Sequence, residues 1–415
     1  MHFYIHSLPP GAEIRIPASI TVPLLQVCVQ LQLPPVITYS DDVLYNWALK
    51  SPSTESTPAL DNLRCLTLFT GTRDEEEFYL SSARIELRGV DALEIMRATM
   101  DELFVGDALA ARRITRYLHS LVRVLDDLAR LLLRVRDGCD PETFYHVIRP
   151  WFNGADSGTR KWTFEGLEDH PGLRVPTEIS GPSAAQSPLI HALDAFLGVD
   201  HSTPNSTPSA PHSEGSSCPP TPAPAPEAVS PAAGDTATAR GPRPKAPFLT
   251  RMRAYMPRHH RNFLSHLSAA PRPLRAAVAR MGDAALTEAY NAAVGALRRF
   301  RDAHLRMVAL YIISPAHRNP TPTCAAPPRA EVVMAETDTA AAVEVSADQL
   351  SIVEIGNGSV GSGGEGGEGE GGEGAAVLGE PVLLRGTGGT DMVRFLKGVR
   401  DRTSEAAFPV NCGAP

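Results

Sequence analysis

A helical pattern of apolar residues surrounds one histidine in residues 289–318. Four apolar residues lie four or seven positions from His304, namely Leu297, Phe300, Val308 and Tyr311. This spacing puts them on the face that carries the imidazole, and it predicts one long helix that ends before Pro315. His304 is then either a hydrogen-bonded core histidine or, in a dry pocket, a ligand of a metal or of haem iron.

Further helices are predicted after a mixed N-terminal part. Residues 93–103 and 108–135 repeat Leu, Ile and Val at helical spacing, which is typical of packing helices. Residues 1–90 combine strand-like stretches at 14–22 and 65–70 with helical ones at 24–33 and 39–50, and we expect an acidic turn at TRDEEE. The prediction is a mainly α protein with a large all-helical domain and a small α+β N-terminal part.

Two low-complexity inserts interrupt this pattern. Residues 201–245 are rich in Pro, Ser, Thr and Ala, and residues 319–384 pass from Pro/Ala-rich sequence to a Gly/Glu repeat. Such segments bury too little apolar surface to offset the entropy of ordering, so we expect both to be disordered.

Composition narrows the class of protein. The formal net charge of −8 argues against nucleic acid or an anionic membrane as the main partner. The six cysteines are scattered without a CxxC pair, which favours a reducing compartment over a disulfide framework. No signal peptide is visible, and no apolar run reaches the ~20 residues that a membrane span needs. We expect a soluble, cytoplasmic monomer.

Aromatic side chains precede an arginine in PETFYHVIRPWFNG. Phe144, Tyr145 and Arg149 could form a helix end whose arginine binds a surface carboxylate. Alternatively, the two rings and the guanidinium could bind an amino acid with an aromatic side chain. Aromatic rings pack against one another, and a guanidinium binds a carboxylate through two hydrogen bonds. His259, His260 and His266 lack the ligand spacing of a zinc site, and we interpret their segment as a structural turn.

Several short motifs occur together in one order. They are LPPVITYSDDVLYNW, EFYLSSARIE, GPSAAQS, FLTRMRAYMPRHHRNFL, the His304 helix and GTGGTD. With this series the chain resembles the indoleamine 2,3-dioxygenase family, whose members are haem proteins that open the indole ring of tryptophan.

The resemblance implies haem b as cofactor, L-tryptophan and O2 as substrates, and N-formyl-L-kynurenine as product. It implies His304 as the proximal iron ligand, with Arg301, Asp194 and Ser183 at the haem. It also implies a catalytic helper, Ser82, and substrate-binding residues, which are Tyr39, Phe78, Phe144, Tyr145, Arg149, Ser183, Ala184 and Thr387. Many relatives carry an uncharged residue where Asp42 stands, and GTGGTD is expected to close over the substrate.

The resemblance also predicts how the chain is divided. Residues 1–90 would be a remnant of the small N-terminal domain, and residues 91–200 and 246–318 the two parts of the haem domain. Residues 385–415 would form the GTGGTD loop and a terminal helix. Relatives carry a further stretch before the N-terminal match, so we expect most of the small domain to be missing. The alternative function is therefore a haem-binding or scaffold relative without catalysis.

Overall fold

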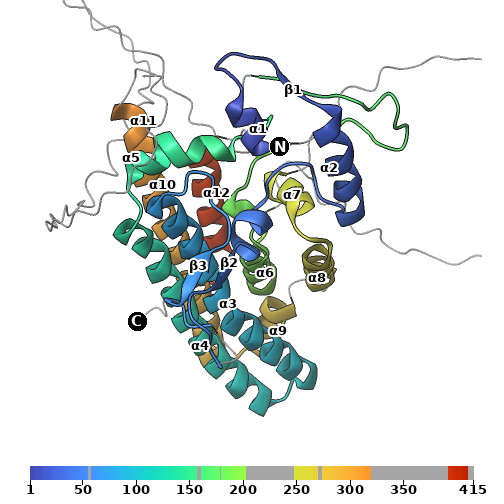
Figure 1. The fold of residues 1–415 in the computed structure, drawn as a ribbon. Helices are drawn as coiled ribbons and strands as arrows, with labels where there is room; N and C mark the ends of the chain where they lie inside the picture. Colours follow the sequence, from blue (N-terminus) through green and yellow to red (C-terminus); the bar gives the residue numbers. More distant parts are fainter. Residues whose placement is uncertain are drawn as a thin grey trace, which may run out of the picture. The chain divides into compact units, whose positions relative to one another are not determined.

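The computed structural model describes residues 1–54, 58–156, 160–177, 179–201, 247–269, 273–318 and 391–409. These belong to the unit formed by residues 1–320 and 383–415. The described chain is mainly helical with short strands, which confirms the predicted fold class (Figure 1). Except for His201, both predicted inserts lie outside the described residues, and so does Thr387.

Long helices surround the main core. Helix α10 (Ala284–Val308) packs against α4 (Ala108–Leu133) and α12 (Met392–Glu405), and α4 packs against α3 (Arg73–Val105) (Figure 1). Their facing sides bury leucines, isoleucines and alanines at the helical spacing that the sequence predicts.

The predicted acidic turn is instead the first turn of α3. Thr72 caps this helix, because its hydroxyl accepts a hydrogen bond from the Glu75 N–H at 3.2 Å. The fully buried Glu75 carboxylate accepts backbone N–H groups from residues 69–71. Acidic residues in the first turn also stabilise a helix, because they interact favourably with the positive end of its dipole. The prediction was wrong because this run of charges starts a helix.

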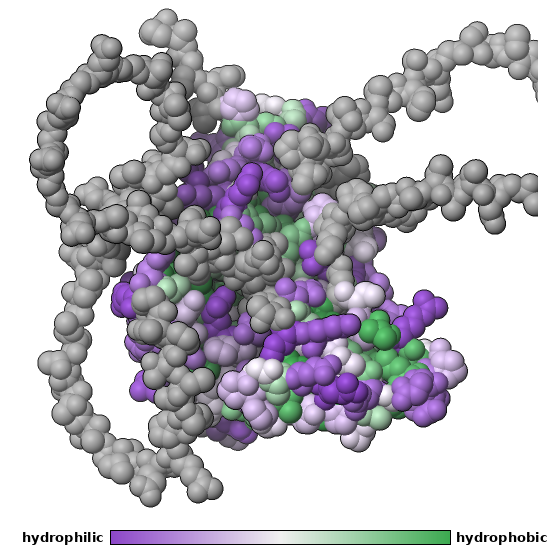
Figure 2. All heavy atoms as spheres, turned by 90° about the horizontal axis from the view of Figure 1, so that it is seen from above, coloured by the Kyte–Doolittle hydropathy of each residue, from purple (hydrophilic) through white to green (hydrophobic). Residues whose placement is uncertain are grey.

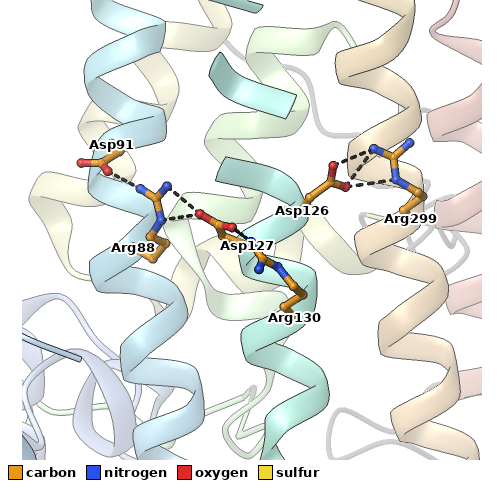
Figure 3. Close-up of polar contacts among 6 residues, drawn as sticks. All are labelled: Arg88, Asp91, Asp126, Asp127, Arg130 and Arg299. Carbon is orange, nitrogen blue, oxygen red and sulfur yellow. Dashed lines mark hydrogen bonds and ion pairs between the residues drawn. The ribbon is translucent and has the colours of Figure 1, made fainter. Parts of the chain in front are cut away.

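Ion pairs on the outer surface join the same helices (Figure 3). Arg299 of α10 contacts Asp126 of α4 at 2.8 Å. Arg88 of α3 contacts Asp127 of α4 at 2.7 Å and also pairs with Asp91. Ion pairs at a protein surface contribute about 0–1 kcal/mol each, so the apolar core carries most of the stability.

Short elements form the N-terminal part. Strand β1 (Ile14–Ile16) runs parallel to β4 (Trp162–Phe164), with Ile14 opposite Trp162. Helix α1 (His2–Ser7) precedes β1, and helix α2 (Ala18–Leu31) follows it. The helix predicted at 24–33 therefore begins six residues earlier, directly after Pro17, and it contains Pro23.

Residues 39–50 do not form the single helix that the sequence predicted. They form a π-helical turn, η1 (Ser40–Leu44), and strand β2 (Trp47–Leu49), which pairs antiparallel with β3 (Leu63–Cys65). Pairing with β3 satisfies the backbone of β2, and this tertiary partner overrides the local helical pattern.

The helix of His304 does not end before Pro315. Helix α10 passes into a π turn, η7 (Ala309–Ile313), and then into α11 (Ser314–Arg318). Proline lacks the N–H of an ordinary α-helical bond and crowds the preceding turn. The wider turn just before Pro315 lets the chain continue as a helix.

The remaining elements connect these parts of the fold. They are η2 (Arg134–Asp137), α5 (Pro141–Thr143), η3 (Phe144–Ile148), η4 (Arg149–Phe152), η5 (Ala184–Gln186), α6 (Pro188–Leu197), α7 (Phe248–Met252), η6 (Arg253–Tyr255), α8 (Arg258–Ala269) and α9 (Pro273–Met281). Helix α6 packs against α8 and α9.

The surface mixes residue types. On the face in Figure 2, where grey atoms do not cover it, hydrophobic residues lie in separate groups among hydrophilic ones. Within the described residues, every helix is too short or too polar to cross a membrane.

Candidate active site

A cavity of about 320 Å³ collects most of the predicted site residues. The predicted residues that line it are Tyr39, Phe78, Ser82, Phe144, Arg149, Ser183, Ala184, Asp194, Arg301 and His304. They come from both sides of the first insert, so the fold brings together residues that are far apart in sequence. Asp42 and Tyr145 do not belong to this wall, and Asp42 is a buried carboxylic acid whose pKa is raised by burial and by Asp41.

A π-helical turn aligns the aromatic residue and the arginine. In η3 the backbone N–H of Arg149 donates to the carbonyl of Phe144, five residues earlier. This bond brings Arg149 under Phe144, and both side chains face the cavity. The Phe78 ring lies 4.4 Å from that of Phe144, and Tyr311 packs edge-on to it at 5.7 Å.

Tyr145 has a different position from Phe144. Its ring lies 5.2 Å from the centre of the Arg149 guanidinium, a cation–π contact. Burial lowers the pKa of Arg149, and the neighbouring Tyr145 opposes this shift. Tyr145 therefore contacts the arginine, while Phe144 contacts the cavity.

His304 of α10 also lines the cavity. Its pKa is lowered to about 4 by burial and by the positive charge of Arg301, so the ring is neutral at pH 7. No hydrogen bond joins the imidazole to another described residue. Phe300, Met307 and Val308 line the cavity beside it. A neutral imidazole in an apolar wall has a lone pair available for a metal.

A buried ionic network stands behind His304. Arg301 contacts the Asp194 carboxylate of α6 and the Thr403 hydroxyl of α12. His201 Nε2 contacts the other Asp194 oxygen at 2.8 Å. Burial alone would raise the pKa of Asp194, but Arg301 and His201 hold this pKa below its usual value. The network joins α6, α10 and α12 at the back of the cavity.

Glycines allow the loop before α6 to approach the chain closely. A Cβ on Gly181 would lie 1.7 Å from the Phe152 carbonyl oxygen, and one on Gly154 would lie 2.2 Å from the Ile179 oxygen. The loop then turns at Ser183, whose hydroxyl accepts the Ala185 N–H at 3.2 Å. This geometry brings Ser183 and the following alanine to the cavity wall.

Three polar residues of the wall were not predicted from the sequence, namely Ser81, Glu86 and Ser187. Glu86 follows Phe78 and Ser82 at intervals of four along α3, so helical spacing alone could have indicated it. His191 of α6 also lines the cavity, and its Nε2 contacts the Ala185 carbonyl at 2.9 Å.

No group of three or more His, Cys, Asp or Glu side chains that could hold a metal ion occurs in the described part of the chain. His259 and His260 pack ring against ring at 4.3 Å in α8. GTGGTD lies outside the described residues except for Asp391, whose side chain caps α12.

The fold and site define a mainly helical protein with a largely apolar cavity whose wall carries two histidines, His191 and His304, and two arginines, Arg149 and Arg301. The family model described as Indoleamine 2,3-dioxygenase matches residues 1–406, and the chain belongs to this family.

Individual proteins of known name are also similar to the chain in sequence. The chain is 30% identical to indoleamine 2,3-dioxygenase 1 of Mus musculus over 309 residues, which cover 74% of this chain and 64% of that protein. It is 33% identical to indoleamine 2,3-dioxygenase of Saccharomyces cerevisiae over 328 residues, or 76% and 63% of the two chains. A protein named myoglobin from Haliotis madaka is 28% identical over 309 residues, or 73% and 66%. The chain thus spans less than two thirds of the mouse and yeast relatives.

Proposed function

We propose that this protein is a haem-dependent dioxygenase that converts L-tryptophan and O2 to N-formyl-L-kynurenine. The observation that carries the proposal is that three groups line one cavity, namely the neutral imidazole of His304, the ring of Phe144 and the guanidinium of Arg149. The mouse and yeast relatives carry the name of this activity.

The donor set suits a haem. His304 would hold the iron, because its ring is neutral and makes no hydrogen bond within the described chain. Arg301 beside it would partner a haem propionate or stay with Asp194, and Ser183 would cover the macrocycle. When bound, haem supplies the activation of O2 and the redox chemistry that inserts both oxygen atoms.

The chain itself would bind and orient the substrate. Phe144 and Phe78 offer aromatic faces to the indole, and Arg149 offers two N–H donors to the carboxylate. Tyr39 closes the pocket, and Ser82 can hydrogen-bond the indole N–H. Orienting C2 and C3 of the indole toward the reactive centre would supply much of the rate. Thr387 and the GTGGTD loop stay predicted contacts of the amino group.

The test begins with protein reconstituted with haem, reductant, air and L-tryptophan. We expect a Soret band and formation of N-formylkynurenine, identified by absorbance and mass. His304→Ala should lose the Soret band. Arg149→Met should raise the KM for tryptophan about 10- to 100-fold with an unchanged Soret band, because a charge-assisted hydrogen bond contributes ~1.5–3 kcal/mol.

A matched control is Arg134→Met, whose side chain is 69% exposed on the surface. It should change neither the spectrum nor the KM. Normal turnover by Arg149→Met would show that another residue binds the carboxylate.

The second candidate is haem binding without turnover. The similar protein from Haliotis madaka favours it, since it bears the name myoglobin. A Soret band with reversible O2 binding, and no product from tryptophan under any tested condition, would select this candidate.

A further inference from the structure

Gln186 connects two segments that are distant in sequence. Its Oε1 accepts the backbone N–H of Tyr39 at 2.9 Å, and its Nε2 donates to the Gly181 carbonyl at 2.9 Å. The side chain is 1% exposed, so water cannot replace these partners. One amide thus fastens the N-terminal wall of the cavity to the loop before α6.

Glu86 connects the same two segments from the other side. Its Oε1 accepts the hydroxyl of Tyr39 at 2.9 Å and the hydroxyl of Ser187 at 2.5 Å. Because Ser187 follows Gln186 directly, the contacts form a closed circuit of Tyr39, Gln186, Ser187 and Glu86. Tyr39 is held both by its backbone and by its hydroxyl.

This circuit borders the cavity. Tyr39, Glu86 and Ser187 line it, and Gln186 lies next to Ser187 in the chain. Burial raises the pKa of Glu86, and burial with the neighbouring Glu86 raises the pKa of Tyr39 well above its usual value. The hydroxyls of Tyr39 and Ser187 oppose the shift of Glu86, because both donate a hydrogen bond to its carboxylate.

We propose that Gln186 and Glu86 are positioning residues, which hold Tyr39 in the cavity wall so that the aromatic substrate meets a preformed pocket. This inference rests on the proposed function and extends it to two residues without an assigned role. A preformed wall avoids the ordering cost of binding, so its loss should appear in substrate affinity more than in the chemical step.

Paired variants separate positioning from simple packing. Gln186→Leu removes both contacts, whereas Gln186→Glu keeps the acceptor for the Tyr39 N–H and loses the donor to Gly181. Glu86→Leu removes the acceptor for both hydroxyls, whereas Glu86→Gln keeps it. We expect each leucine variant to raise the KM for tryptophan tenfold or more with kcat changed less than threefold. The conservative partner should recover most of the KM.

The control is Gln26→Leu, an exposed glutamine of α2, which should match the wild type. Equal KM values for Glu86→Leu and Glu86→Gln would overturn the positioning role of Glu86. A parallel fall in kcat without a change in KM would overturn it for both residues.

Hydrogen exchange gives a readout that does not need activity. In Gln186→Leu, the amide of Tyr39 loses its acceptor and should exchange at least tenfold faster in the haem-free protein, while amides of α4 keep their wild-type rates. An unchanged exchange rate of the Tyr39 amide would refute the positioning role of Gln186.

If the wild type binds haem but does not turn over tryptophan, the proposed function is refuted and the positioning role is not. That role would then be tested by hydrogen exchange and by the dissociation constant of L-tryptophan from the haem-loaded protein, measured from the shift of the Soret band. Equal dissociation constants for wild type and Gln186→Leu would refute it.

Discussion

Asp194→Asn tests the buried network behind His304, because it removes one charge and keeps the side-chain shape. Arg301 and Asp194 are 7% and 6% exposed, so the guanidinium would stay buried without its counter-ion. Removing one partner of such a pair costs about 3–5 kcal/mol. For an ordered region of this size, the midpoint of thermal unfolding should fall by about 10 °C.

The assay is urea and thermal unfolding of the haem-free protein, followed by circular dichroism. Asp126→Asn is the matched control, since it breaks the exposed pair with Arg299 that Figure 3 shows. That change should cost less than about 1 kcal/mol. The double variant Asp194→Leu/Arg301→Met should be clearly more stable than Asp194→Asn, because it leaves no buried charge.

Two results would refute this reasoning. If Asp194→Asn costs no more than Asp126→Asn, the Arg301 charge is stabilised by Thr403 or water and does not depend on the carboxylate. If the double variant is as unstable as the single one, packing and not charge explains the loss.

Three further predictions concern backbone, pH and specificity. Gly181→Ala should lower the free energy of unfolding by about 3 kcal/mol in urea titrations, because its Cβ would overlap the Phe152 carbonyl. The pKa of His2 is lowered to about 4 by burial, so the unfolded chain binds this proton first as pH falls. The free energy of unfolding should therefore fall by up to about 3 kcal/mol between pH 7 and pH 4, and His2→Gln should lose that component. Tyr145→Phe should keep the KM for tryptophan within about twofold, because the ring and not the hydroxyl contacts Arg149.

The sequence predicted regular helices better than the segments around them. The long apolar repeat of α4 determines its own burial, so its limits were predicted within two residues. The strand β2 depends on a partner strand, and the start of α3 depends on the Thr72 cap and on Glu75, so tertiary contacts decide both. A local pattern cannot weigh such contacts.

Candidate site residues were predicted in part from residue type and in part from family resemblance. The apolar face around His304 indicated a buried imidazole, but only the fold shows that Arg149 and Phe78 face the same cavity. Helical spacing places Glu86 with Phe78 and Ser82, but its residue type favours the surface, and only the fold shows the partners that it has in the interior, Tyr39 and Ser187.

The π-helical turns explain why spacing alone could not build this site. Five residues along an α-helix turn the side chain by about 140°, so Phe144 and Arg149 would point to different sides. The bond between residues five apart in η3 brings both to one side. The other two π turns also lie at the cavity. Tyr39, which lines it, directly precedes η1, and Tyr311 and Ile312 of η7 line it as well. Wide turns are weaker than α-helical ones, so their concentration at one cavity indicates that the fold gives up regular geometry there to orient side chains inward.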